Sequence, residues 1–299
     1  MTTTKRFLLI FLSICVFSAC NKEQGPNIDS SNCYVSKKNP IKKDTKRIVS
    51  VSPQITELLC DLGCYDKLVG RTDFCKYPEK VKNITSIGGI NNANLEKIIS
   101  LKPDLVITSS IFTKKMFIII EDAHIPIISF KESNKIEGMY NVINMLGKIT
   151  DKEQQATKLI NDCKQQLQHI QQQRDSINQV RHITKKPTVY YVVGYGSGGD
   201  FSAGKNTYIN EIITLAGGDN IAKDSKVWSF SKETLFKRQP EFIFVRQEDS
   251  AQFVNTYPYT NLNAVKKHKV YGIESSLMDI QTPRSIKAIE YISHILSNR

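Results

Sequence analysis

Two glutamates occupy equivalent places in the chain, each two residues after a residue that can cap a helix. Glu96 follows Asn94, and Glu233 follows Ser231. In the first turn of a helix a carboxylate is stabilised by the helix dipole, which alone could explain both residues. Two exposed carboxylates at a fixed separation could also pair with two arginines of a two-fold symmetric partner, which orients docking more than it strengthens it.

A glycine-rich segment and the histidines bear on whether the chain is an enzyme. The sequence GYGSGG at 194–199 satisfies the G-x-G-x-x-G dinucleotide pattern, but no helix signal follows until about Asn206. We therefore interpret these glycines as a flexible rim of a cleft. Ser197 has Tyr195 where a nucleophile elbow requires glycine, and no histidine lies in a motif that would place it beside a nucleophile. We expect a binding protein and not an enzyme.

Cysteines are the remaining candidates for metal or redox chemistry. Those that follow Cys20 are Cys33, Cys60, Cys64, Cys75 and Cys163. Export would permit disulfides, but an odd number cannot pair completely, and the sequence does not say which pair. Cys60 and Cys64 lie one helical turn apart, which suits buried packing or one edge of a metal site. Because no histidine or second cysteine pair stands at ligand spacing, packing is favoured, and no resident metal or cofactor is expected.

The first 19 residues are expected to be a signal peptide. Lys5 and Arg6 precede an apolar run over 7–17 that is too short to span a membrane. Cleavage before Cys20 would leave a thiol that can be acylated, so Cys20 is the candidate lipid anchor; the alternative is an ordinary signal peptide with an incidental cysteine. The polar residues 20–46 are expected to form a flexible tether. We therefore expect an exported lipoprotein of the cell envelope, on the periplasmic face of a membrane.

The chain is basic, with a formal net charge of +12 that falls to +10 if Lys5 and Arg6 leave with the signal peptide. The excess is scattered and lacks the interleaved aromatic residues of a nucleic-acid-binding surface. We therefore expect no nucleic-acid partner. The charge is consistent either with a solvated surface near anionic lipid or with attraction of an acidic ligand.

Short apolar runs alternate with amphipathic segments from Arg47 onward. Strands are expected at 47–51, 66–72, 104–110, 125–130, 188–194, 241–247 and 269–274, with helices from Pro53 to Gly63 and near 94–101, 113–123 and 284–298. This alternation predicts parallel sheets covered by helices on both faces.

A long polar helix is expected over about 150–180. Its apolar stripe consists of Ala156, Leu159, Ile160, Cys163, Leu167 and Ile170. At about 1.5 Å per residue it would extend roughly 45 Å, enough to bridge two lobes; the alternative is a surface helix of one domain.

The second half of the chain repeats the first. Residues 94–108 align without a gap on 231–245, which pairs Glu96 with Glu233. An earlier segment, ITELLCDLG, aligns on INEIITLAG and pairs Glu57 with Glu211. Units that recur in the same order on each side of a long helix predict an α/β fold of two similar lobes with central, mostly parallel sheets. We place the N-terminal lobe at 47–140, the linking helix at 141–185 and the C-terminal lobe at 186–299.

Residues 47–110, which include RIVSVSPQITELLCDLG and NLEKIISLKPDLVITSS, resemble the N-terminal lobe of the class III periplasmic binding proteins, and 201–245 resembles their second lobe. These proteins serve ABC importers of vitamin B12, ferric siderophores and haem. The resemblance implies one rigid helix between the lobes and a monomer that docks on a permease dimer with its ATPase subunits. It also implies that Glu96 and Glu233 pair with arginines of the permease.

The resemblance also places the ligand between the lobes. The matching positions are Phe74, Ile90, Ser109, Phe201, Trp228 and Arg284. Trp228 suits ligand stacking, with a partly buried loop anchor as the alternative, and Arg284 could meet a ligand carboxylate or cap a helix. Ile90 and Ser109 replace tryptophans of the vitamin B12 binding protein, which argues against a corrinoid held in the same way.

A smaller aromatic wall in a basic chain is compatible with an anionic ferric chelate. The expected ligand is therefore a metal chelate: a ferric siderophore, haem or another iron complex, or cobalamin. The alternative function is a lipoprotein that recognises another protein on the same scaffold, with an exported enzyme as the less favoured alternative.

Overall fold

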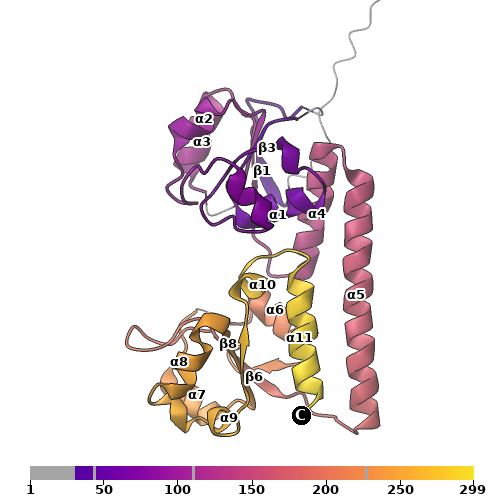
Figure 1. Ribbon diagram of the computed structural model, residues 1–299, viewed down its shortest axis with the longest axis vertical. Coiled ribbons are helices and arrows are strands. Elements are labelled where there is room, and N and C mark those ends of the chain that lie inside the picture. The colour runs from indigo at the N-terminus through magenta and orange to yellow at the C-terminus, as the bar shows by residue number, and fades with distance from the viewer. Residues whose placement is uncertain (1–30, 43–44, 110–111, 226–227) are drawn as a thin grey trace, which may run out of the picture.

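The computed structural model describes residues 31–42, 45–109, 112–225 and 228–299 (Figure 1). They form an upper, N-terminal lobe and a lower, C-terminal lobe, with a long helix along one side of both (Figure 1). Each lobe has a mostly parallel sheet with helices on its faces, which confirms the expected two-lobed α/β fold.

The N-terminal lobe is built on a sheet with the strand order β1-β5-β4-β2-β3. These strands are β1 (Cys33–Val35), β2 (Ile48–Ser50), β3 (Leu68–Arg71), β4 (Leu105–Ser109) and β5 (Ile127–Phe130). Its helices are α1 (Pro53–Asp61), α2 (Leu95–Ser100), α3 (Lys114–Asp122) and α4 (Ile136–Thr150), with 3-10 turns at Tyr65–Lys67 and Glu79–Asn83. All residues of β2 and β4 are buried, as expected of strands that helices cover on both sides.

The C-terminal lobe repeats this topology with the order β7-β6-β8-β9. Its strands are β6 (Thr188–Val192), β7 (Asp219–Asn220), β8 (Phe242–Arg246) and β9 (Val270–Ile273). Its helices are α6 (Tyr208–Leu215), α7 (Lys232–Arg238), α8 (Ser250–Asn255), α9 (Asn263–Lys266), α10 (Ser275–Asp279) and α11 (Ser285–Ser297), with 3-10 turns at Gln247–Asp249 and Tyr259–Asn261. Because β5-β4-β2-β3 and β9-β8-β6-β7 correspond strand by strand, the sequence repeat is a repeat of structure.

One long helix, α5 (Glu153–Val180), connects the lobes, which confirms the expected bridging helix; the sequence did not reveal that α4 precedes it in a helical hairpin. α4 ends at Thr150, the following residue Asp151 adopts a left-handed conformation with φ of 60°, and α5 runs back along α4. The two helices approach closely, since a Cβ on Gly147 would lie 2.6 Å from that of Ala156. α5 alone bridges the lobes: its 28 residues extend about 42 Å and pack on α4 in one lobe and on α11 in the other.

One hydrophobic cluster is continuous between the lobes. It contains Leu58 of α1 and Ile143 of α4 in the N-terminal lobe, Ile212 of α6 and Ile289 of α11 in the C-terminal lobe, and Cys163 of α5. The opposite face of each sheet has its own separate cluster. The lobes are therefore joined by a shared core as well as by the covalent chain.

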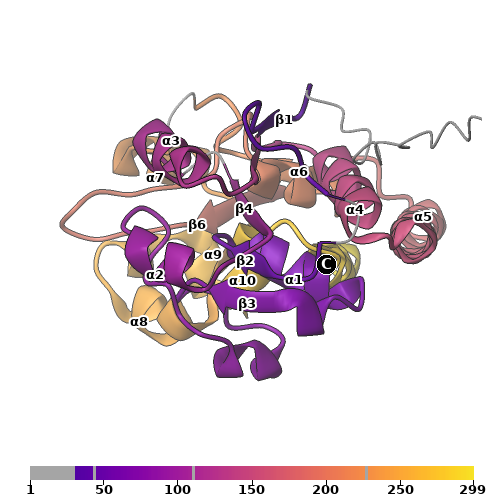
Figure 2. The same cartoon turned by 90° about the horizontal axis from the view of Figure 1, so that it is seen from above.

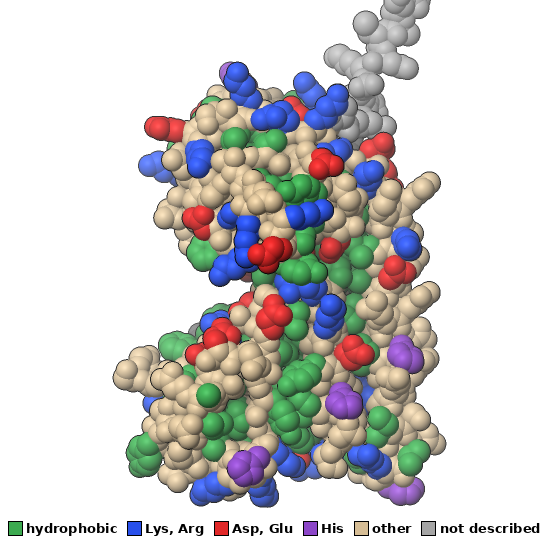
Figure 3. Space-filling model, in the orientation of Figure 1, with side chains coloured by type: hydrophobic (Ala, Val, Ile, Leu, Met, Phe, Trp, Pro, Cys, Tyr) green, Lys and Arg blue, Asp and Glu red, His purple; other side chains and the backbone are tan. Residues whose placement is uncertain are grey.

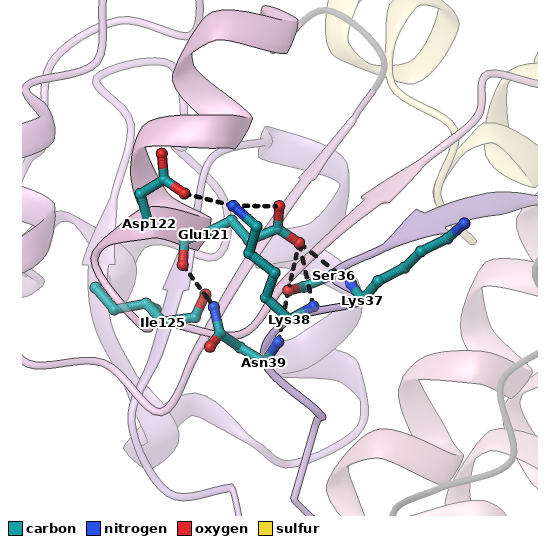
Figure 4. A network of polar contacts seen from close by, with 7 residues as sticks. All are labelled: Ser36, Lys37, Lys38, Asn39, Glu121, Asp122 and Ile125. Carbon is teal, nitrogen blue, oxygen red and sulfur yellow. Dashed lines mark hydrogen bonds and ion pairs between the residues drawn. The ribbon is translucent and has the colours of Figure 1, made fainter.

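The packed body begins earlier than the expected boundary at residue 46. β1 pairs antiparallel with the edge strand β5, and the side chains of Cys33 and Ile41 are buried. The residues after β1 are held by Glu121 at the end of α3 (Figure 4). Its Oε1 accepts hydrogen bonds from Ser36 Oγ at 2.8 Å and from the backbone N–H of Lys37 at 3.2 Å. An open sheet edge and a helix end thus supply partners for a segment whose own sequence gives little sign of structure.

Candidate functional site

A cavity of about 630 Å³ lies between the lobes, which a deep indentation separates in the space-filling view (Figure 3). The N-terminal lobe contributes Ser52, Pro53, Gln54, Ile90, Ser109, Glu132, Ser133 and Asn134 to its wall. The C-terminal lobe contributes Val193, Gly204, Asn206, Thr207, Tyr208, Ile209, Ser225, Trp228, Arg246, Met278, Asp279, Ile280 and Gln281. Most of these residues follow the carboxyl ends of parallel strands, where open α/β sheets bind their ligands.

Two helices begin at the cavity, one from each lobe. Ser52 and Pro53 are the cap and first residue of α1, and Thr207 and Tyr208 are the cap and first residue of α6. Thr207 accepts a hydrogen bond from the backbone N–H of Asn210, whereas the side chain of Ser52 makes no cap bond. Both helix ends direct N–H groups and the positive end of a dipole at the space between the lobes.

The structure places the expected ligand-binding residues in three settings. Ile90, Ser109 and Trp228 line the cavity, and Trp228 is 48% exposed. Phe201 is not part of the wall but pairs as an isolated bridge with Ser229, next to Trp228, and is exposed. Phe74 is also exposed and outside the wall. The ring of Trp228 is therefore available to a ligand at the mouth of the cavity.

Arg284 does not line the cavity, because Glu57 of the other lobe binds its guanidinium. The two nitrogens Nε and Nη2 donate to the two carboxylate oxygens of Glu57 at 2.9 and 2.8 Å. The guanidinium also stacks on the ring of Tyr77, 4.0 Å from its centroid. Both side chains of the ion pair are largely buried, with exposures of 11% for Arg284 and 1% for Glu57.

A second ion pair crosses between the lobes at the equivalent place in the repeat. Glu211, which aligns with Glu57, accepts from Lys135 Nζ of the N-terminal lobe at 2.6 Å. Gln281 adds two more links: its carbonyl accepts from Gln54 Nε2 at 2.9 Å, and its Nε2 donates to the carbonyl of Ser133 at 2.6 Å. Each lobe thus contributes one glutamate from the first helix after its first central strand to hold the other lobe.

Arg246 and Asp279 are two of the polar wall residues that the sequence did not reveal. Arg246 is the last residue of β8, and Asp279 is the last residue of α10. Arg246 Nη2 donates to Asp279 Oδ2 at 3.0 Å. Burial raises the pKa of Asp279, and the neighbouring arginine opposes that rise. A charged residue at the end of an apolar strand was the signal that could have pointed to Arg246.

The proposed docking glutamates lie on helices that occupy the same side of the molecule. Glu96 of α2 and Glu233 of α7 are exposed in the first turns of their helices, after Asn94 and Ser231, which cap them through their side chains. Hydrogen bonds from the backbone and from Ser231 lower the pKa of Glu233. α2 and α7 both lie on the side away from α5 in two perpendicular views (Figures 1 and 2).

The glycine-rich segment is a loop and does not open a helix, since the next helix, α6, begins only at Tyr208. Gly196 and Gly199 have φ of 111° and 109°, which favours glycine. Asp200 holds the loop, accepting from the hydroxyl of Tyr259 and pairing with Lys232 at 3.7 Å. This arrangement lacks the helix start that a dinucleotide site requires.

Among the described residues, the cysteines and the other side chains able to bind a metal ion form no further site. Cys60, Cys64, Cys75 and Cys163 make no disulfide there, and Cys33 Sγ lies 3.7 Å from Met145 Sδ. Among the same residues, no three His, Cys, Asp or Glu side chains gather to hold a metal ion. No helix within the described part of the chain is long and apolar enough to cross a bilayer. Cys20, the candidate lipid anchor, lies outside the described residues.

Comparison with known proteins places this architecture in a family. The sequence profile of the periplasmic binding protein family matches residues 48–277, which includes both sheets except β1. The chain belongs to this family. Its members are solute-binding proteins, and the chain is accordingly a substrate-binding protein of an ABC transporter, a role that implies a permease, an ATPase and a small-molecule ligand.

Named relatives and solved structures support this assignment. The chain is 31% identical to the uncharacterized ABC transporter substrate-binding lipoprotein YvrC of Bacillus subtilis, over 89% of this chain and 83% of the relative. It is 27% identical to a vitamin B12-binding protein of Vibrio campbellii, over 82% and 86%. A possible iron-binding protein of Staphylococcus epidermidis matches with a TM-score of 0.72 and 25% identity, over 85% and 99%. The vitamin B12 binding protein of Vibrio cholerae shares the fold, with a TM-score of 0.71 and 23% identity, over 85% and 97%.

Proposed function

We propose that this chain is a lipoprotein, anchored through Cys20, that captures a metal chelate between its lobes and delivers it to the permease of an ABC importer. The chelate is a ferric siderophore, haem or another iron complex, or cobalamin. The observation that carries the proposal is the cavity at the strand ends of both lobes, with Trp228 in its wall. A flat chelate can stack on the indole ring while hydroxyl and amide groups hold its edges.

The positions of α2 and α7 support the delivery step. Glu96 and Glu233 are exposed on the same side of the molecule, one on each lobe, and are free to meet a partner with two-fold symmetry. In this proposal each glutamate pairs with an arginine of one permease subunit. The chain binds as a monomer, so one ligand-loaded molecule serves one permease dimer.

Titration of the purified protein with cyanocobalamin, haemin and several ferric chelates tests the proposal. A Cys20→Ser variant without the first 19 residues avoids acylation and gives soluble protein. Trp228 is the only tryptophan, so its fluorescence reports on the cavity directly. Because coloured ligands absorb the emitted light, calorimetry measures the affinities independently of fluorescence. It also measures the Trp228→Phe variant, which has no tryptophan signal. Absence of saturable binding by every chelate would refute the proposal.

A further inference from the structure

The charge of the cavity wall differs from that of the whole chain. Of the described residues that line the cavity, the charged ones are Glu132, Arg246 and Asp279. Arg246 is already paired with Asp279, at 3.0 Å, and each side chain is about one-third exposed. Among the described wall residues the cation is Arg246, which is engaged before a ligand arrives, and Glu132 adds a negative charge. The described wall therefore does not share the positive excess of the whole chain, whose Lys and Arg side chains are scattered over the face shown in Figure 3.

Neutral hydrogen-bonding groups make up most of the polar wall. Hydroxyls and amides come from both lobes, among them Ser109, Asn134, Asn206 and Gln281. The starts of α1 and α6 contribute a partial positive charge of about +0.5 each, which offsets the charge of Glu132. The described part of the wall is therefore close to electroneutral and rich in donors and acceptors.

This balance discriminates between chelates. An anionic chelate would lose water around its charges and find the wall cation occupied, which is costly unless each buried charge gains a partner. An uncharged chelate exchanges its hydrogen bonds to water for bonds to the wall at little net cost. Resting on the proposed function, we infer that the cavity selects an electroneutral metal chelate with amide or hydroxyl groups at its periphery. The Arg246–Asp279 pair sets this preference by keeping the arginine engaged.

Paired ligands of similar size and different charge test the inference. Calorimetry would compare an electroneutral ferric trihydroxamate with a trianionic ferric tris-catecholate, and electroneutral cyanocobalamin with haemin, which carries two propionates. We expect the tightest ligand of the panel to be electroneutral, at least tenfold tighter than the tightest anion, or about 1.4 kcal/mol. An anion that binds as tightly or more tightly overturns the inference and leaves the proposed function intact. Absence of binding by the entire panel refutes both.

Substitutions of charged wall residues then test whether these charges cause the preference for electroneutral chelates. Asp279→Asn releases Arg246 and should shift the ratio of affinities at least tenfold toward the anionic chelate. Glu132→Gln should shift it in the same direction without disturbing a paired residue, because Glu132 is exposed; it carries the test if the Asp279 variant does not fold. Glu290→Gln makes the same change of net charge on the exposed side of α11 and serves as the control. If both wall variants match this control, the inference is wrong.

Discussion

Replacing Glu57 by glutamine removes the charge from the buried partner of Arg284 with little change in shape. The pair loses one of its ions while the guanidinium stays 11% exposed between the lobes. Breaking a buried pair in this way costs about 3–5 kcal/mol. Glu274, whose Oε1 lies 3.3 Å from the guanidinium, compensates in part, so we expect a loss of about 2–4 kcal/mol in the free energy of unfolding.

The equivalent ion pair of the repeat provides a matched control. Glu211 pairs with Lys135, but the lysine side chain is 66% exposed, so solvent screens the interaction. Glu211→Gln should therefore cost no more than about 1 kcal/mol. The double change Glu57→Gln with Arg284→Met should recover part of the loss, because no unpaired charge remains buried.

Urea unfolding followed by far-UV circular dichroism measures all of these variants. The slope of the transition should stay constant, because the same surface is exposed on unfolding. If Glu57→Gln costs no more than Glu211→Gln, the pair does not stabilise the joint between the lobes, and the reasoning from burial fails.

Three further predictions concern docking, closure and thiol reactivity. The double variant Glu96→Ala with Glu233→Ala should keep ligand affinity within about twofold and abolish uptake. The control variant Glu153→Ala with Glu290→Ala should leave affinity and uptake unchanged. If the Glu96 and Glu233 variant loses its affinity for the ligand, these carboxylates serve the ligand and not the permease. Small-angle scattering should show only a small change on ligand binding, because α5 and the shared core oppose hinge motion; a large rotation would contradict this. Burial raises the pKa of Cys60 to about 12, so its thiol should be almost fully protonated at pH 8. It should therefore react with iodoacetamide far more slowly than an unstructured cysteine, at a rate that still rises above pH 10. Peptide mapping by mass spectrometry measures this rate, and rapid alkylation at pH 8 would contradict the burial.

Local signals in the sequence were sufficient to predict these helices and strands and their repetition in the two lobes. The capped starts of α2 and α7 are visible because Asn94 and Ser231 each bond the N–H three residues later. Apolar runs located β4 and β8 because their residues are buried on both faces. The alignment of these units predicted two similar lobes, and the four strands that the lobes share have the same order in both.

Long-range contacts decided what the sequence left open. Arg284 and Glu57 are 227 residues apart, so nothing near Arg284 signals that a partner from the other lobe binds it. The hairpin between α4 and α5 was missed because the chain reverses at Asp151, in a left-handed conformation that usually calls for glycine. β1 was assigned to the tether because three residues form a strand only when an edge such as β5 is present.

The attachment of residues 33–42 to the N-terminal lobe would limit how far a protein anchored at Cys20 could move from the membrane. If Cys20 carries the lipid, the chain takes 13 Cα-to-Cα steps from it to Cys33, and at roughly 3.5 Å each these span at most roughly 45 Å. A chain free up to residue 46 would reach about twice as far. With both proteins at the same membrane face, so short a connection would confine the loaded protein to a thin layer beside the membrane and raise its effective concentration near the permease. In the proposed docking mode, weak binding through two carboxylates would then suffice for capture and would also let the emptied protein leave.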